Sequence, residues 1–194
     1  NFIEKRRAYR QLTRLLRNYP ERNDLRRSLV DVLIARGSFA EAKKQIDDLQ
    51  SRDFDEDELD YLYALSNGVL GEYEEAIKDV SELVGFDENQ DPQFDYRRAM
   101  APEMVKAYLL FAKIHRERNK GQDDERRADA AIEQMVAHNP SSAEAFLIRG
   151  RYLLETKTAG SPESENERLS RSAESLGKAL ELDPKDEEAL LENA

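Results

Sequence analysis

The sequence predicts an all-α fold, a right-handed α-solenoid of antiparallel helix pairs, with about four repeats and a half repeat at each end. Three observations support this prediction. The stretch 29–83 repeats itself at an offset of 34 residues, so that ARGSFAEAKKQIDDL is answered by VLGEYEEAIKDVSEL. Within each copy, apolar residues three and four positions apart are typical of amphipathic helices, and a glycine separates two such runs. A fixed period of this length is typical of stacked helical repeats.

The repeated copies explain how each helix pair forms. Glycine tolerates the left-handed backbone of a tight helix exit, and an alanine in the middle of the second helix lets two helix backbones approach closely. Six pairs of residues are equivalent in the two copies: Gly37 and Gly71, Phe39 and Tyr73, Glu41 and Glu75, Ala42 and Ala76, Ile46 and Val80, and Leu49 and Leu83.

We expect a single repeat domain over residues 1–194, divided along the sequence as follows. A half repeat (1–22) precedes repeats at 23–56, at 57–102 with a long loop 86–101, at 103–142, and at 143–186 with an insertion 156–168; a further repeat starts at 187–194. Pro102 suits the first position of a helix, and Ser161 and Pro162 suit the start of another, so we expect the insertion to lengthen that helix. Since the chain begins and stops inside helices, we expect it to be a piece of a longer protein.

The pattern resembles the tetratricopeptide repeat (TPR) family, whose unit has a small residue in each helix and a proline after the second. The small first-helix residues are Val30, Ala64, Ala112, Gly150 and Ala194, and the small second-helix residues are Ala8, Ala42, Ala76, Ala128 and Ser172. The closing prolines are Pro20, Pro140 and Pro184, whereas Phe54 and Glu88 stand at this position in the middle repeats. The resemblance covers nearly the whole chain and implies the fold, not the partner.

Composition excludes several classes of function. With no cysteine, the chain has no disulfide and no thiolate nucleophile or metal ligand. A net charge of −11 argues against nucleic-acid binding, and no apolar run approaches the roughly 20 residues that span a bilayer. Residues 1–22 nevertheless carry seven basic and two acidic side chains. They offer a surface to an acidic partner or a membrane, although a solvated helix face is the favoured interpretation.

We find no catalytic, cofactor or metal motif and predict that the chain is not an enzyme. The aspartates at 53, 55, 57 and 60 imitate a calcium loop, but Glu58 replaces its glycine and Ala64 its bidentate glutamate. We interpret them as helix-start and surface charge. His115 occupies a packing position in a first helix, so we expect a satisfied, half-buried histidine.

The TPR resemblance implies a concave groove lined by the first helices. Carried over by register, the predicted partner-binding residues are Arg27, Tyr61, Leu65, Lys106, Leu109, Lys113, Arg116, Leu147, Arg151 and Leu154. For the apolar members, the alternative is ordinary core packing misassigned by one position.

The leading prediction of function is a non-catalytic scaffold that binds a protein or peptide segment in this groove. The basic residues of its later repeats favour a segment with an apolar anchor and an acidic end. The alternatives are a spacer or oligomerisation arm of a larger protein, and an accessory domain of an enzyme whose catalytic part lies elsewhere. We also expect a weak homodimer through the exposed repeat ends.

Overall fold

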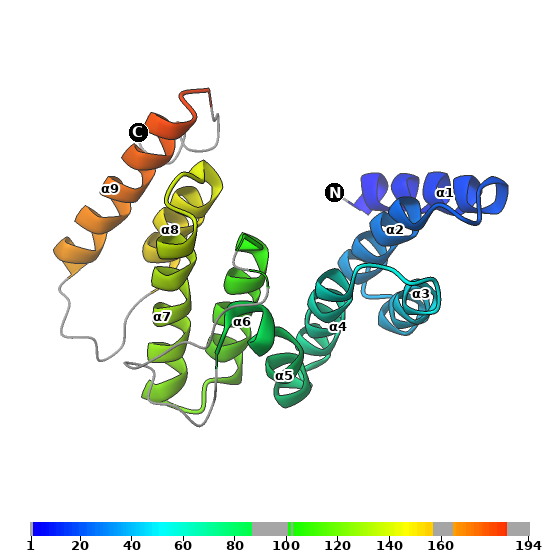
Figure 1. Cartoon of the computed structure of the whole chain (residues 1–194), viewed down its shortest axis with the longest axis horizontal. Helices are drawn as coiled ribbons and strands as arrows, with labels where there is room; N and C mark the ends of the chain where they lie inside the picture. Colours follow the sequence, from blue (N-terminus) through cyan, green and yellow to red (C-terminus); the bar gives the residue numbers. More distant parts are fainter. Residues whose placement is uncertain (1, 87–100, 102, 157–164, 186–194) are drawn as a thin grey trace. The chain divides into compact units, whose positions relative to one another are not determined.

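A computed structural model describes residues 2–86, 101, 103–156 and 165–185, and these residues form helices and no strand. The described chain divides into two compact units, Asn1–Leu83 and Val84–Ala194. Neighbouring helices such as α2 and α3, or α6 and α7, run antiparallel and are joined by short turns (Figure 1). The division into repeats and the hand of the array remain predictions. No helix in this part of the chain is long and apolar enough to cross a bilayer.

The first unit contains α1 (Phe2–Asn18), α2 (Asn23–Ala35), α3 (Phe39–Gln50), α4 (Glu56–Leu70) and α5 (Tyr73–Val84), whose last residue belongs to the second unit. Its core is aliphatic because each helix turns one apolar stripe inward. The buried core residues are Leu29, Val30, Leu33, Ala42, Ile46, Leu49, Leu59 and Leu62. Tyr9, Leu12 and Leu16 of α1 pack against this core, so α1 closes one end of it.

The 34-residue register is visible in the backbone hydrogen bonds of the two turns. Ser38 donates to the carbonyl of Leu33, and Glu72 donates to that of Asn67, each at 2.9 Å. The glycine before each donor, Gly37 or Gly71, has a positive φ of 72° or 79°. Ala42 and Ala76 follow these turns and are both fully buried. Both small residues therefore lie inside the core, as the repeated register predicts.

The second unit contains α6 (Val105–Arg118), α7 (Gln122–His138), α8 (Ala143–Glu155) and α9 (Glu165–Leu182). Tyr108 and Phe111 of α6 are fully buried with Ile132 and Met135 of α7. In the next pair, Gly150 of α8 lies opposite Leu176 of α9, where an added Cβ would come within 2.7 Å of the leucine side chain. A larger residue at position 150 would require the Leu176 side chain to shift.

The structure changes several local predictions. Helix α6 begins at Val105, and Met104 before it donates a backbone hydrogen bond to the carbonyl of Ala101. Pro102, which we expected at the first helical position, lies outside the described residues. His115 is fully buried rather than half-buried. Ser142 caps α8, accepting a hydrogen bond from the backbone N–H of Ala145. The loop 87–100, the start of the insertion (157–164) and the last residues (186–194) lie outside the described residues.

Candidate functional site

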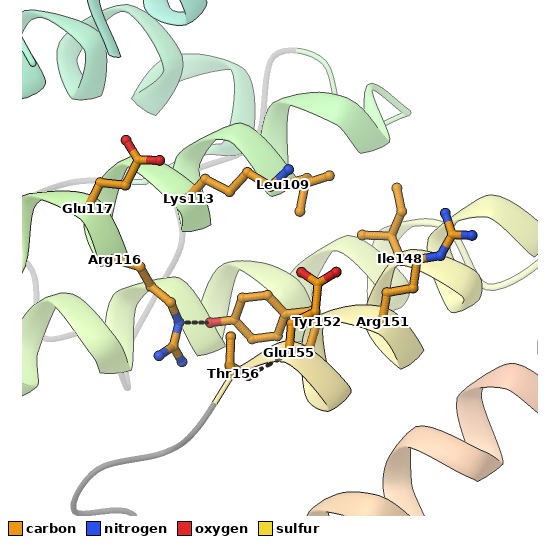
Figure 2. Close-up of a pocket in the computed structure, with 9 residues that line it drawn as sticks. All are labelled: Leu109, Lys113, Arg116, Glu117, Ile148, Arg151, Tyr152, Glu155 and Thr156. Carbon is orange, nitrogen blue, oxygen red and sulfur yellow. Dashed lines mark hydrogen bonds between the residues drawn. The ribbon is translucent and has the colours of Figure 1, made fainter. Parts of the chain in front are cut away.

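A cavity of about 440 Å³ lies on the second unit, between one face of α6 and one face of α8. Figure 2 shows the α6 side chains on one side and the α8 side chains on the other. The spacing of the lining residues follows the helical period, because side chains three and four positions apart share a face. The lining consists of Leu109, Lys113, Arg116 and Glu117 from α6, and Ile148, Arg151, Tyr152, Glu155 and Thr156 from α8 and its end.

A polar triangle fixes one wall of this cavity. The Nε of Arg116 donates to the hydroxyl of Tyr152 at 2.7 Å, and that hydroxyl donates to the carboxylate of Asp129 at 2.7 Å. Arg116 also pairs with Asp129 directly, at 2.6 Å. Burial, with Asp129 adding to it, raises the pKa of Tyr152, so the phenol keeps its proton at neutral pH. The triangle ties α6, α7 and α8 together and fixes the Arg116 guanidinium in the cavity wall.

The rest of the lining combines apolar and charged groups. Leu109 and Ile148 are half-buried, one on each helix, and supply an apolar contact surface. Three basic residues (Lys113, Arg116 and Arg151) face two acidic ones (Glu117 and Glu155), an excess of one positive charge. Lys113 is exposed, whereas Arg151 is half-buried. Such a site can hold a ligand by apolar contact and orient it by charge.

The cavity brings together four of the residues predicted for the groove: Leu109, Lys113, Arg116 and Arg151. Lys106 is half-buried one turn before Leu109 on α6 and does not line the cavity. Leu147 is 6% exposed and packs against Leu176 and Ala179 in the α8–α9 core. Leu154 is 42% exposed and also lies outside the lining. For Leu147, core packing is what the structure shows.

The three predicted residues of the first unit do not line this cavity. Arg27 forms ion pairs with Asp31 and Glu58, so neighbouring carboxylates compensate its charge. Tyr61 packs against the aliphatic core of its unit, and Leu65 is half-buried. These three residues therefore do not form a basic binding surface in the first unit.

Five lining residues were not predicted: Glu117, Ile148, Tyr152, Glu155 and Thr156. On α8 the error is one position, because Ile148 and Glu155 line the cavity where Leu147 and Leu154 were expected. One position turns a side chain by about 100° around the helix. The sequence did contain a signal, since positions 148, 151, 152 and 155 form a continuous row at helical spacing.

A second group of titratable residues lies buried between α6 and α7. His115 Nδ1 is hydrogen-bonded to Asp124 at 2.8 Å, and Arg118 pairs with the same carboxylate. The ring of His115 packs against those of Phe86 and Phe111. Burial lowers the pKa of His115, so the ring is neutral at pH 7. His115 is fully buried and lines none of the cavities described here, so we assign the group to stability rather than to chemistry.

No grouping of three or more acidic or histidine side chains in the described part of the chain is suited to hold a metal ion. Of the aspartates at 53, 55, 57 and 60, Asp55 caps the start of α4, where it accepts a hydrogen bond from the backbone N–H of Glu58. This capping bond satisfies a helix N–H that would otherwise lack a partner.

Comparison with known proteins shows a likeness to a solved structure. No family model matches the chain, and no curated protein matches it. The chain is similar to YrrB, described as a TPR protein with an unusual peptide-binding site, with 18% sequence identity and a TM-score of 0.46. The similarity covers 98% of this chain and 84% of the YrrB chain.

Proposed function

We propose that this TPR-like array of helix pairs is a non-catalytic protein-interaction scaffold, and that the α6–α8 cavity holds a segment of its partner. The segment places an apolar side chain between Leu109 and Ile148 and an acidic group near Lys113 and Arg151. The observation that carries the proposal is the meeting of apolar and basic side chains from two helices in one cavity.

The chemistry of the lining supports this kind of ligand. Burial of an apolar anchor supplies affinity at roughly 25 cal/mol per Å². Lys113 and Arg151 favour an acidic group beside them and disfavour a basic one, so these charges determine orientation and selectivity. The Arg116 guanidinium is already fixed by Tyr152 and Asp129, so little side-chain freedom is lost there when a ligand binds.

The test uses short synthetic peptides that share one leucine anchor and differ only at the end, which is either acidic or lysine-rich. We expect the whole chain to bind the acidic peptide, as measured by fluorescence anisotropy. The double variant Lys113→Glu with Arg151→Glu should weaken this binding at least about tenfold, which is about 1.4 kcal/mol. It should also reverse the preference in favour of the lysine-rich peptide.

A matched control separates the cavity from net charge. Lys44 and Arg52 are exposed in the first unit, and their joint reversal to Glu changes net charge by the same amount. This control should leave peptide affinity unchanged. Equal affinity of the parent and the cavity variant for both peptides would contradict the proposal, as would failure of the parent chain to bind either peptide.

A further inference from the structure

We propose that α1 is a docking surface for a second copy of this chain, and that its row of arginines receives the acidic row of α5 from that copy. The arginine row is Arg7, Arg10, Arg14 and Arg17. The acidic row is Glu72, Glu75, Asp79 and Glu82. This inference is independent of the peptide cavity, which lies in the other unit.

The arginine row is exposed and aligned. Its members are three, four and three positions apart, so they follow one face of α1 over about 15 Å. All four side chains are exposed. In the described part of the chain, no ion pair compensates any of them, whereas Arg26 and Arg27 of α2 and Arg22 just before it all have carboxylate partners.

The N-terminal end of the arginine row borders a depression in the protein surface. Ile3, Arg6, Arg7, Arg10 and Gln11 line a surface depression of about 370 Å³. Ile3 lies one turn before Arg7 on the same face and is 73% exposed. The row therefore offers a partner an apolar contact at one end and cations along its length, a combination that fits a protein surface.

The acidic row has the same spacing as the arginine row, with members three, four and three positions apart. Glu72, Glu75 and Glu82 are exposed, and Asp79 is half-buried against Asn67, which donates to it at 3.0 Å. Burial, together with the nearby charges of Asp79 and Glu82, raises the pKa of Asp60 on α4 to about 6. Lys78 and Lys43 offset part of this charge near Asp79.

The two rows match each other but cannot pair within one unit. Helices α1 and α5 lie at opposite ends of the first unit, with α2, α3 and α4 between them (Figure 1). Pairing therefore requires two molecules, and the contact is head-to-tail, which produces chains or rings rather than a symmetric dimer. Among anionic partners, a second copy is the one whose complementary surface the structure itself provides.

The experiment measures the mass of the whole chain in solution by light scattering over a range of protein concentrations and salt. We expect the mass to rise above that of one chain at about 0.01 M salt. It should return to that of one chain at about 1 M salt, because the Debye length shortens from about 30 Å to about 3 Å.

Complementary charge reversal identifies the contact. The variants Arg10→Glu with Arg14→Glu, and Glu75→Lys with Glu82→Lys, should each stay monomeric at low salt. An equal mixture of the two variants should associate again, because the reversed α1 row of the first variant fits the reversed α5 row of the second, and their unchanged rows still fit each other. All four residues are exposed, so the fold should persist by circular dichroism.

The control variant Lys44→Glu with Arg52→Glu should self-associate like the parent chain. A parent chain that stays monomeric at low salt and high concentration would overturn the proposal. Association that survives both reversals would do the same. A monomeric parent that binds anionic lipid vesicles, and loses this binding on Arg10→Glu with Arg14→Glu, would assign the row to a membrane surface instead.

Discussion

The carboxylate of Asp124 is 2% exposed and is bonded from three directions. It accepts hydrogen bonds from Arg118 and from the backbone N–H of Lys120 at 2.7 Å, and it contacts His115. Burial alone would raise the pKa of Asp124, but the bonds from Arg118, His115 and Lys120 outweigh it, and the pKa lies well below its usual range. The group therefore holds the end of α6 against the start of α7.

Replacing Asp124 with Asn should destabilise the second unit by about 3–5 kcal/mol, since it removes the carboxylate charge from the buried Arg118–Asp124 ion pair. Urea unfolding at pH 7 measures this loss. The pKa of Asp124 is lowered in the fold, so its contribution persists at neutral pH and is lost only as pH falls below about 4. A loss below about 1 kcal/mol would show that the buried group is not structurally important.

His115 predicts a separate pH effect. Its pKa is lowered by burial, so below about pH 6.5 the unfolded chain binds a proton that the folded chain does not. Stability of the second unit should therefore decrease as pH falls from about 6.5 towards 5. NMR titration of the His115 ring should show a pKa below that of an unfolded control at the same ionic strength.

Titration of Asp60 should make the stability of the first unit fall, rather than rise, as pH increases. Its pKa is raised to about 6, first by burial and then by Asp79 and Glu82. A carboxyl group with a raised pKa stabilises the fold at low pH, and this stabilisation is lost as pH rises through about 6. Because the side chain is partly exposed to solvent, we expect Asp60→Asn to add only about 1 kcal/mol at pH 7. The gain should vanish below about pH 4, near the pKa of the unfolded chain.

At the scale of the helices, substitutions of three glycines test the assigned register, because these glycines occupy different environments. Gly71 has a φ of 79° at a helix exit, Gly150 is crowded by Leu176, and Gly177 lies in α9 with no heavy atom within 4 Å of an added Cβ. Gly71→Ala should cost about 1 kcal/mol through left-handed strain. Gly150→Ala should cost about 1–3 kcal/mol through overpacking.

Gly177→Ala should instead stabilise the second unit by about 0.5–1 kcal/mol, because alanine is the better helix former in an open helix interior. Thermal unfolding of the three variants, made side by side, compares them under identical conditions. If all three substitutions had the same sign, the assigned turn and crossing positions would be wrong.

The sequence predicts some helices of the fold more accurately than others. Apolar spacing and glycine turns predict the helix pairs and their register. The equivalent backbone hydrogen bonds to the carbonyls of Leu33 and Asn67 confirm the register of these two turns. The start of α6 at Val105 was not predicted, because proline is compatible with both a helix start and a preceding turn. On α8, Leu147 and Ile148 are both aliphatic, so composition could not decide which one faces α9.

At the scale of the whole chain, the charge distribution is uneven in a way that the net value of −11 hides. The arginine row and the acidic row were both evident as composition, but their common spacing becomes meaningful only on two helices at opposite ends of one unit. The peptide cavity depends on α6 and α8, which are about forty residues apart in sequence, so its lining was predicted only in part. Tyr152 and Asp129 lay outside the register argument because they act through Arg116.

The hydrogen-bonded triangle of Arg116, Tyr152 and Asp129 also makes occupancy of the cavity measurable by tyrosine fluorescence. The chain contains no tryptophan, so tyrosine emission is not masked. Tyr152 lines the cavity and donates its hydroxyl proton to a carboxylate, an arrangement that quenches phenol fluorescence. An occupant that disturbs this bond should brighten the emission of the unlabelled chain, and Tyr152→Phe should remove the signal. The protein thus contains its own fluorescent reporter of occupancy.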